Sequence, residues 1–146
     1  MKTKLNFKGQ EFEIDSESNE RVYTGLSFGV EALKQDKVIS YYLFNRDKLF
    51  SIELIRFLKL AGIDPTKENE IFYFPMDNKI VVEGWYDIIG KVLTNNAASF
   101  HWQVDQCTTN AHFGNDSRHG MLGDFKYFET FRLDFSIVIP NEILKD

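Results

Sequence analysis

Three histidines gather in one short window of the chain. They are His101, His112 and His119, and the same window holds Asp105 and Cys107. An imidazole near a carboxylate is suited to proton transfer. This window is therefore the part of the sequence with the strongest indication of chemistry.

Strand periodicity indicates which of these side chains share a surface. Residues 99–108 alternate between apolar and polar side chains, with His101 and Asp105 on the polar face. Residues 125–139 form a second predicted strand, in which the apolar residues are odd-numbered and Arg132 is on the polar side. If these strands pair antiparallel, one register that joins their apolar faces sets His101 near Arg132.

This pairing predicts a candidate pocket on the polar face. Its members are His101, Asp105, Arg132 and Asp134, with His112 or His119 supplied by the loop at 109–123. The histidines and carboxylates suit proton transfer, and the arginine suits an anionic substrate. The alternative is the solvated face of a half-buried sheet, because such strands alternate polar and apolar residues in any case.

Metal binding and cysteine chemistry have weaker support. The spacings between His101, Cys107, His112 and His119 are irregular, whereas structural zinc sites prefer close Cys or His pairs. Cys107 lies six residues from His101, about 20 Å along a strand, so the two side chains do not touch. We therefore predict no metal, no cofactor and no catalytic residue, and a lone cysteine on a strand is more often inert packing.

The predicted loop at 109–123 is long and contains several glycines, yet it also carries Phe113, Met121 and Leu122. Loops of this length within compact domains are usually functional or disordered. Apolar residues in a glycine-rich loop favour a lid or a contact with a partner.

The remaining pattern predicts the elements around this window. We expect a hairpin at 3–15, a strand at 22–30, a strand at 38–44 and a hairpin at 71–83. Apolar periodicity predicts two main helices, at about 48–61 and 85–94, with Gly62 ending the first. The fold class expected is a single α+β domain over residues 1–146, with a mostly antiparallel sheet of about seven to eight strands.

Composition excludes several classes of function. The net charge is −5 and no Lys/Arg run exceeds two residues, which disfavours direct nucleic-acid binding. No stretch approaches the ~18–20 apolar residues of a membrane-spanning helix. A single cysteine and the lack of a signal-peptide pattern favour a cytoplasmic protein.

Two functional hypotheses remain, together with simple homo-oligomerisation. The first is a non-catalytic protein-binding domain, in the form of a small acidic inhibitor or immunity-type protein that docks on a basic partner. The second is a small enzyme or ligand-binding domain that uses the pocket above. For the first hypothesis, the candidate contacts are Glu11, Glu13, Asp15, Glu17, Phe113, Met121 and Leu122.

Overall fold

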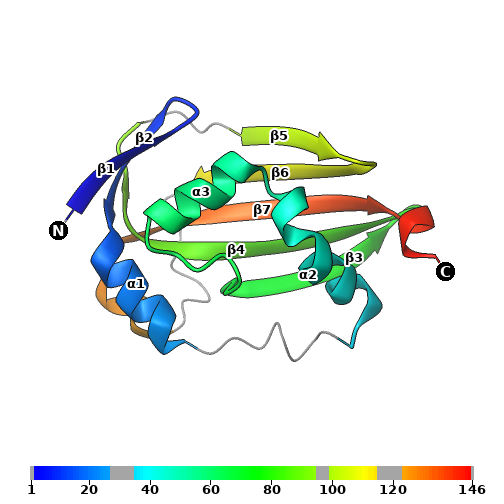
Figure 1. Ribbon diagram of the computed structural model, residues 1–146, viewed down its shortest axis with the longest axis horizontal. Helices are drawn as coiled ribbons and strands as arrows, with labels where there is room; N and C mark the ends of the chain where they lie inside the picture. Colours follow the sequence, from blue (N-terminus) through cyan, green and yellow to red (C-terminus); the bar gives the residue numbers. More distant parts are fainter. Residues whose placement is uncertain (1, 27–34, 95–98, 115–122, 146) are drawn as a thin grey trace.

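The N-terminal segment forms the predicted hairpin. Strand β1 (Lys2–Phe7) pairs antiparallel with β2 (Gln10–Asp15), and Phe7, Phe12 and Ile14 are buried. In the computed structural model (Figure 1), the residues described are 2–26, 35–94, 99–114 and 123–145.

Within those ranges, three α-helices follow the hairpin: α1 (Ser16–Gly25), α2 (Lys37–Leu49) and α3 (Ile52–Leu60). Each begins at a polar cap, because Asp15, Asp36 and Ser51 accept hydrogen bonds from backbone amides of the first turn. The predicted helix at 48–61 is confirmed in part, since it starts at Ile52. Gly62 ends it as predicted, with a φ of +84°.

The strand expected at 38–44 is wrong, because these residues lie inside α2. The strand expected at 22–30 is also wrong at 22–25, which ends α1, and positions 27–34 lie outside the described residues. The buried residues of α2 recur at helical spacing: Ile39, Tyr42, Arg46 and Leu49. The β-branched and aromatic residues of this run favour a strand locally. The cap at Asp36 and the helical spacing of the buried residues nevertheless favour the helix.

The second expected helix, at 85–94, is also wrong. Strands β3 (Glu70–Met76) and β4 (Lys79–Val92) form the predicted hairpin, but β4 continues through this range. It pairs with the last strand up to Ile89 and with β2 at residues 90–92. Gly90 permits the approach to β2, since a Cβ there would lie 2.3 Å from the carbonyl oxygen of Glu13.

The C-terminal half contains one strand more than predicted. Asp105 takes a φ of +56° and reverses the chain between β5 (Ser99–Val104) and β6 (Cys107–Gly114). Strand β6 therefore replaces part of the expected loop at 109–123. The final strand β7 (Thr130–Pro140) starts later than predicted, after the short 3-10 segment η2 (Gly123–Tyr127).

The predicted direct pairing of the 99–108 strand with the final strand is wrong for the same reason. Strand β6 lies between β5 and β7 and pairs antiparallel with both. The predicted parity of the final strand is confirmed: its odd-numbered residues from Phe131 to Ile139 are buried. The even-numbered residues, including Arg132 and Asp134, therefore lie on the other face of the sheet.

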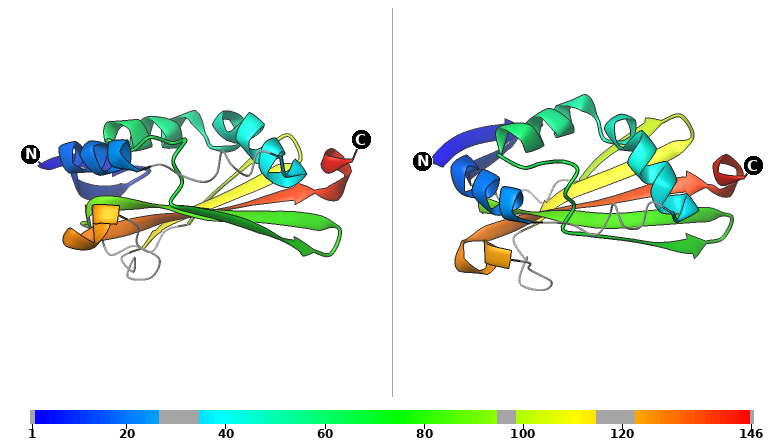
Figure 2. Two further views of the ribbon diagram at one scale, coloured as in Figure 1. Left: turned by 90° about the horizontal axis from the view of Figure 1, so that it is seen from below. Right: turned by 60° about the horizontal axis from the view of Figure 1, so that its bottom comes forward.

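The described strands form one antiparallel sheet in the order β1-β2-β4-β7-β6-β5, with β3 also paired to β4. The α+β class is thus confirmed. Helices α1, α2 and α3 all lie on one side of this sheet (Figure 2). The opposite side of the central strands carries none of these helices, and we call it the helix-free face. Among the described residues, no helix has the length and apolarity that a membrane span requires.

Aromatic rings fill the space between the helices and the sheet. The ring of Phe12 lies 5.2 Å from that of Phe57, 4.6 Å from Phe113 and 5.3 Å from Phe131. Such pairs add to the free energy gained from burial. Phe113, which the sequence placed in a loop, is therefore a core residue and is only 5% exposed.

Candidate functional site

Polar side chains on the helix-free face are arranged in rows across the sheet. Direct cross-strand pairing sets the members of each row side by side. One row consists of Trp85, Asp134, His112 and Ser99. The neighbouring row consists of Phe72, Glu83, Ser136, Asn110 and His101.

These two rows line a groove of about 510 Å³. Aromatic, acidic, imidazole, amide and hydroxyl groups all reach it. The polar and aromatic side chains that line it are Phe72, Glu83, Trp85, Ser99, His101, Asn110, His112, Asp134 and Ser136. The groove is larger than the pocket of about 330 Å³ that Tyr23 and Lys67 line. Its floor is sheet, so ordered backbone fixes the positions of its side chains.

His112 and Asp134 contact each other in the groove, and the contact is an ion pair only when the imidazole is protonated. Nε2 of His112 lies 3.5 Å from Oδ2 of Asp134, and the side chains are 55% and 36% exposed. Burial raises the pKa of Asp134, while nearby His112 and Arg132 act to lower it. Loss of hydration therefore makes the Asp134 carboxylate costly to keep ionised.

His101 is held in the second row. Its Nδ1 is hydrogen-bonded to Oδ1 of Asn110, directly opposite on β6. His101 and His112 thus reach one groove from adjacent strands, although His112 was predicted to come from a loop.

Arg132 lies on the same face as His101 but is engaged elsewhere. Its Nε donates a 3.0 Å hydrogen bond to Oδ1 of Asp87, and its guanidinium lies 4.3 Å from the centre of the Trp85 ring. Asp87 is fully buried, and its Oδ2 has no hydrogen-bond partner among the described residues. Burial raises the pKa of Asp87 to about 6, although Arg132 acts to lower it.

Of the other predicted pocket residues, Asp105 lies away from the groove and His119 is outside the described residues. Asp105 is in the exposed turn between β5 and β6, where Oδ2 lies 3.4 Å from Nζ of Lys48. Met121 and Leu122, which were predicted as partner contacts, also fall outside the described residues. The structure therefore brings together His101, His112 and Asp134, with Arg132 beside them.

The acidic residues suggested as partner contacts lie at the other end of the sheet. Glu13 is flanked by Lys2 at 3.7 Å and Lys91 at 3.9 Å. Asp15 caps α1. Glu17 is in the first turn of that helix, and Glu11 is exposed on β2. Glu13 and Asp15 thus already have structural partners within the chain.

The groove shows no assembled nucleophile. Ser99, His112 and Asp134 lie in one row, but no hydrogen bond joins Ser99 to His112 among the described contacts. Cys107 is buried on the helix-covered side, 3.6 Å from the Tyr41 hydroxyl, and burial raises the pKa of its thiol. Neither side chain has a hydrogen bond to a histidine among the described contacts.

The sequence analysis did not assign several of the lining side chains to the pocket: Phe72, Glu83, Trp85, Ser99, Asn110 and Ser136. Glu83 and Phe72 were assigned to a hairpin without a role, and Trp85 to a helix. Alternation along 79–87 places residues 83, 85 and 87 on one face, and that signal could have found them.

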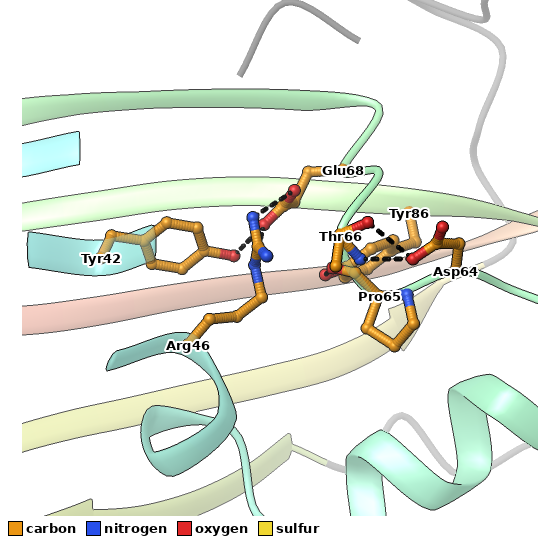
Figure 3. Close-up of polar contacts among 7 residues, drawn as sticks. All are labelled: Tyr42, Arg46, Asp64, Pro65, Thr66, Glu68 and Tyr86. Atoms are coloured by element: carbon orange, nitrogen blue, oxygen red, sulfur yellow. Dashed lines mark hydrogen bonds and ion pairs between the residues drawn. The ribbon is translucent and has the colours of Figure 1, made fainter. Parts of the chain in front are cut away.

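A second polar centre lies under the helices (Figure 3). Nε of Arg46 donates to Oε2 of Glu68 at 2.7 Å, Nη2 donates to Oε1 at 3.0 Å, and the Tyr42 hydroxyl also donates to Glu68. Glu68 is fully buried. Burial raises its pKa, which Arg46 and Tyr42 act to lower. This centre fastens α2 to the segment before β3.

Comparison with protein-family models, with curated proteins and with solved structures finds no match. The described residues contain no group of three or more His, Cys, Asp or Glu residues placed to hold a metal ion.

Proposed function

We propose that this protein is a non-catalytic binding protein, and that a basic protein partner docks on the helix-free face of its sheet. The observation that carries the proposal is the groove of about 510 Å³, with two aromatic rings and two carboxylates on an ordered strand floor. Aromatic side chains are enriched at the centres of protein interfaces. A small acidic inhibitor or immunity-type protein is the form of this function that we favour.

Exposed apolar side chains beside the groove support a protein partner. Phe72 and Phe74 are 42% and 37% exposed, and their rings stack with centroids 6.5 Å apart. Both alternate to the helix-free face from β3, which is paired to β4. Apolar surface next to a polar groove is typical of interaction sites.

The net charge supports a basic partner. The chain carries 17 Lys and Arg residues against 22 Asp and Glu residues. Opposite net charge speeds the encounter of two proteins and makes the association rate fall with salt.

The test compares two serine-to-arginine variants in affinity capture from the native cell. Ser136→Arg fills the groove, and Ser40→Arg places the same side chain on the exposed surface of α2. We expect a partner that wild type and Ser40→Arg retain and Ser136→Arg loses, with thermal unfolding showing that both variants fold. Equal retention by all three proteins would overturn the proposed face.

A second candidate function has one specific observation in its favour. The row Ser99, His112 and Asp134 has the residue types of a hydrolytic triad. Covalent labelling of wild type by a fluorophosphonate probe, lost in Ser99→Ala, would replace the binding proposal with a hydrolase. We expect no labelling, because Ser99 has no hydrogen bond to His112 among the described contacts.

A further inference from the structure

The groove has two carboxylates, and its described lining holds neither a lysine nor an arginine. The carboxylates are those of Glu83 and Asp134. Glu83 is directly opposite Ser136, two residues from Asp134 on β7, so the two acids are diagonal neighbours. Diagonal neighbours on a sheet are separated by about 7–8 Å, which leaves room for a planar cation between them.

Aromatic rings lie next to both carboxylates. Phe72 is directly opposite Glu83, and Trp85 is directly opposite Asp134. A guanidinium group stacks on aromatic faces and binds carboxylates through paired hydrogen bonds, whereas an ammonium group lacks the flat shape for stacking. The lining therefore matches a guanidinium better than an amine.

The chain already uses this chemistry one row away. The Arg132 guanidinium lies 4.3 Å from the centre of the Trp85 ring while Nε bonds to the Asp87 carboxylate at 3.0 Å. Asp134, on the next row, has only the 3.5 Å contact with His112 among its described ion pairs. The Asp87 carboxylate thus binds an arginine of the same chain, and the Asp134 carboxylate faces the groove.

We infer that the groove receives the guanidinium of an arginine side chain from the partner, held between the carboxylates of Glu83 and Asp134 and against Phe72 or Trp85. This assignment rests on the proposed function, since the arginine belongs to the docking protein. It adds to that function the type of partner side chain that the groove binds.

The test is an NMR titration of the whole protein with N-acetyl-arginine amide, up to about 50 mM because a single side chain binds weakly. We expect saturable shifts of the Trp85 indole and of the backbone amides of His112 and Asp134. The citrulline analogue, which has the same shape without the charge, is expected to give no saturable shift. N-acetyl-lysine amide is expected to bind at least about threefold more weakly.

Variants locate the site. We expect Asp134→Asn and Glu83→Gln each to weaken arginine-amide binding about tenfold, as loss of one charge-assisted contact predicts. Asp124→Asn, at an exposed acid outside the groove, is the matched control and should bind as wild type does.

Several outcomes would overturn the inference: no saturable shift with arginine amide, equal binding of citrulline or lysine amide, or unchanged binding by Asp134→Asn. The proposed function fails separately. If Ser136→Arg loses the partner while arginine amide does not bind, the docking face stands and the arginine assignment falls.

Discussion

Two carboxylates, one on each face of the sheet, contact a basic side chain in very different ways. Under the helices, Arg46 donates two hydrogen bonds of 2.7 and 3.0 Å to Glu68, and Tyr42 donates a third. In the groove, His112 and Asp134 make a single contact of 3.5 Å, and both are partly exposed.

The difference concerns hydrogen-bonding capacity. Both Glu68 oxygens are used inside the chain, so this carboxylate has little left to offer a ligand and serves the fold. Asp134 has lost much of its hydration but has gained one long contact in return. A carboxylate in that state is stabilised by an incoming cation, which is why we place function in the groove and structure at Glu68.

The largest effect is expected at the buried pair. Glu68→Gln leaves the buried Arg46 without its counter-charge, and breaking such a pair typically costs about 3–5 kcal/mol. Urea denaturation should show this loss in the free energy of unfolding. Glu53→Gln, at an exposed acid on α3, is the control and should change stability by less than about 0.5 kcal/mol.

A double variant separates charge from packing at this pair. Arg46→Met combined with Glu68→Met removes both charges, and it should recover much of the stability that Glu68→Gln loses. If Glu68→Gln costs less than about 1 kcal/mol, the buried pair does not hold the fold and the comparison between the two faces fails.

Asp87 provides a test that depends on pH. Its pKa is about 6 in the folded protein, with burial as the main cause, against about 3.9 in an unfolded chain. The folded state therefore binds this proton more tightly. The stability that Asp87 contributes is present below about pH 4 and is lost as pH rises through about 6, by up to about 3 kcal/mol.

The measurement is the free energy of unfolding of wild type and Asp87→Asn between pH 4 and 7. Taking the difference between the two proteins removes the opposing effect of Asp15, Asp36 and Asp64, whose hydrogen bonds lower their pKa values. Wild type should lose stability relative to Asp87→Asn as pH rises. A difference that is independent of pH would show that Asp87 is not the costly buried charge described here.

The sequence predicted the side of a strand better than the type of an element. Parity along the final strand depends only on alternation, which a sheet obeys wherever its partners lie. That is why Arg132 and Asp134 were assigned to the correct face and His101 to the same side. The prediction of a strand at 38–44 failed because β-branched and aromatic residues favour a strand locally. The helical spacing of the buried residues is set by contacts distant in sequence.

The site was predictable only in part for a related reason. His101, His112 and Asp134 were named, but the groove also depends on β4, where a helix was expected over residues 85–94. The turn at Asp105 was missed because the segment Val104-Asp105-Gln106-Cys107 has no glycine or proline to mark it. Without that turn, β6 was read as a loop and the wrong strands were paired.

The smallest effect on stability is expected at Asp134, and its sign is informative. Burial raises the pKa of this carboxyl, so its ionised form costs the folded state free energy. Asp134→Asn removes the charge and keeps the shape, so the free energy of unfolding at pH 7 should stay constant or rise by less than about 1 kcal/mol. Urea denaturation beside Glu68→Gln measures this directly. If Asp134→Asn were as destabilising as Glu68→Gln, the groove pair would also be part of the structural framework, because a residue kept for binding should be dispensable for folding.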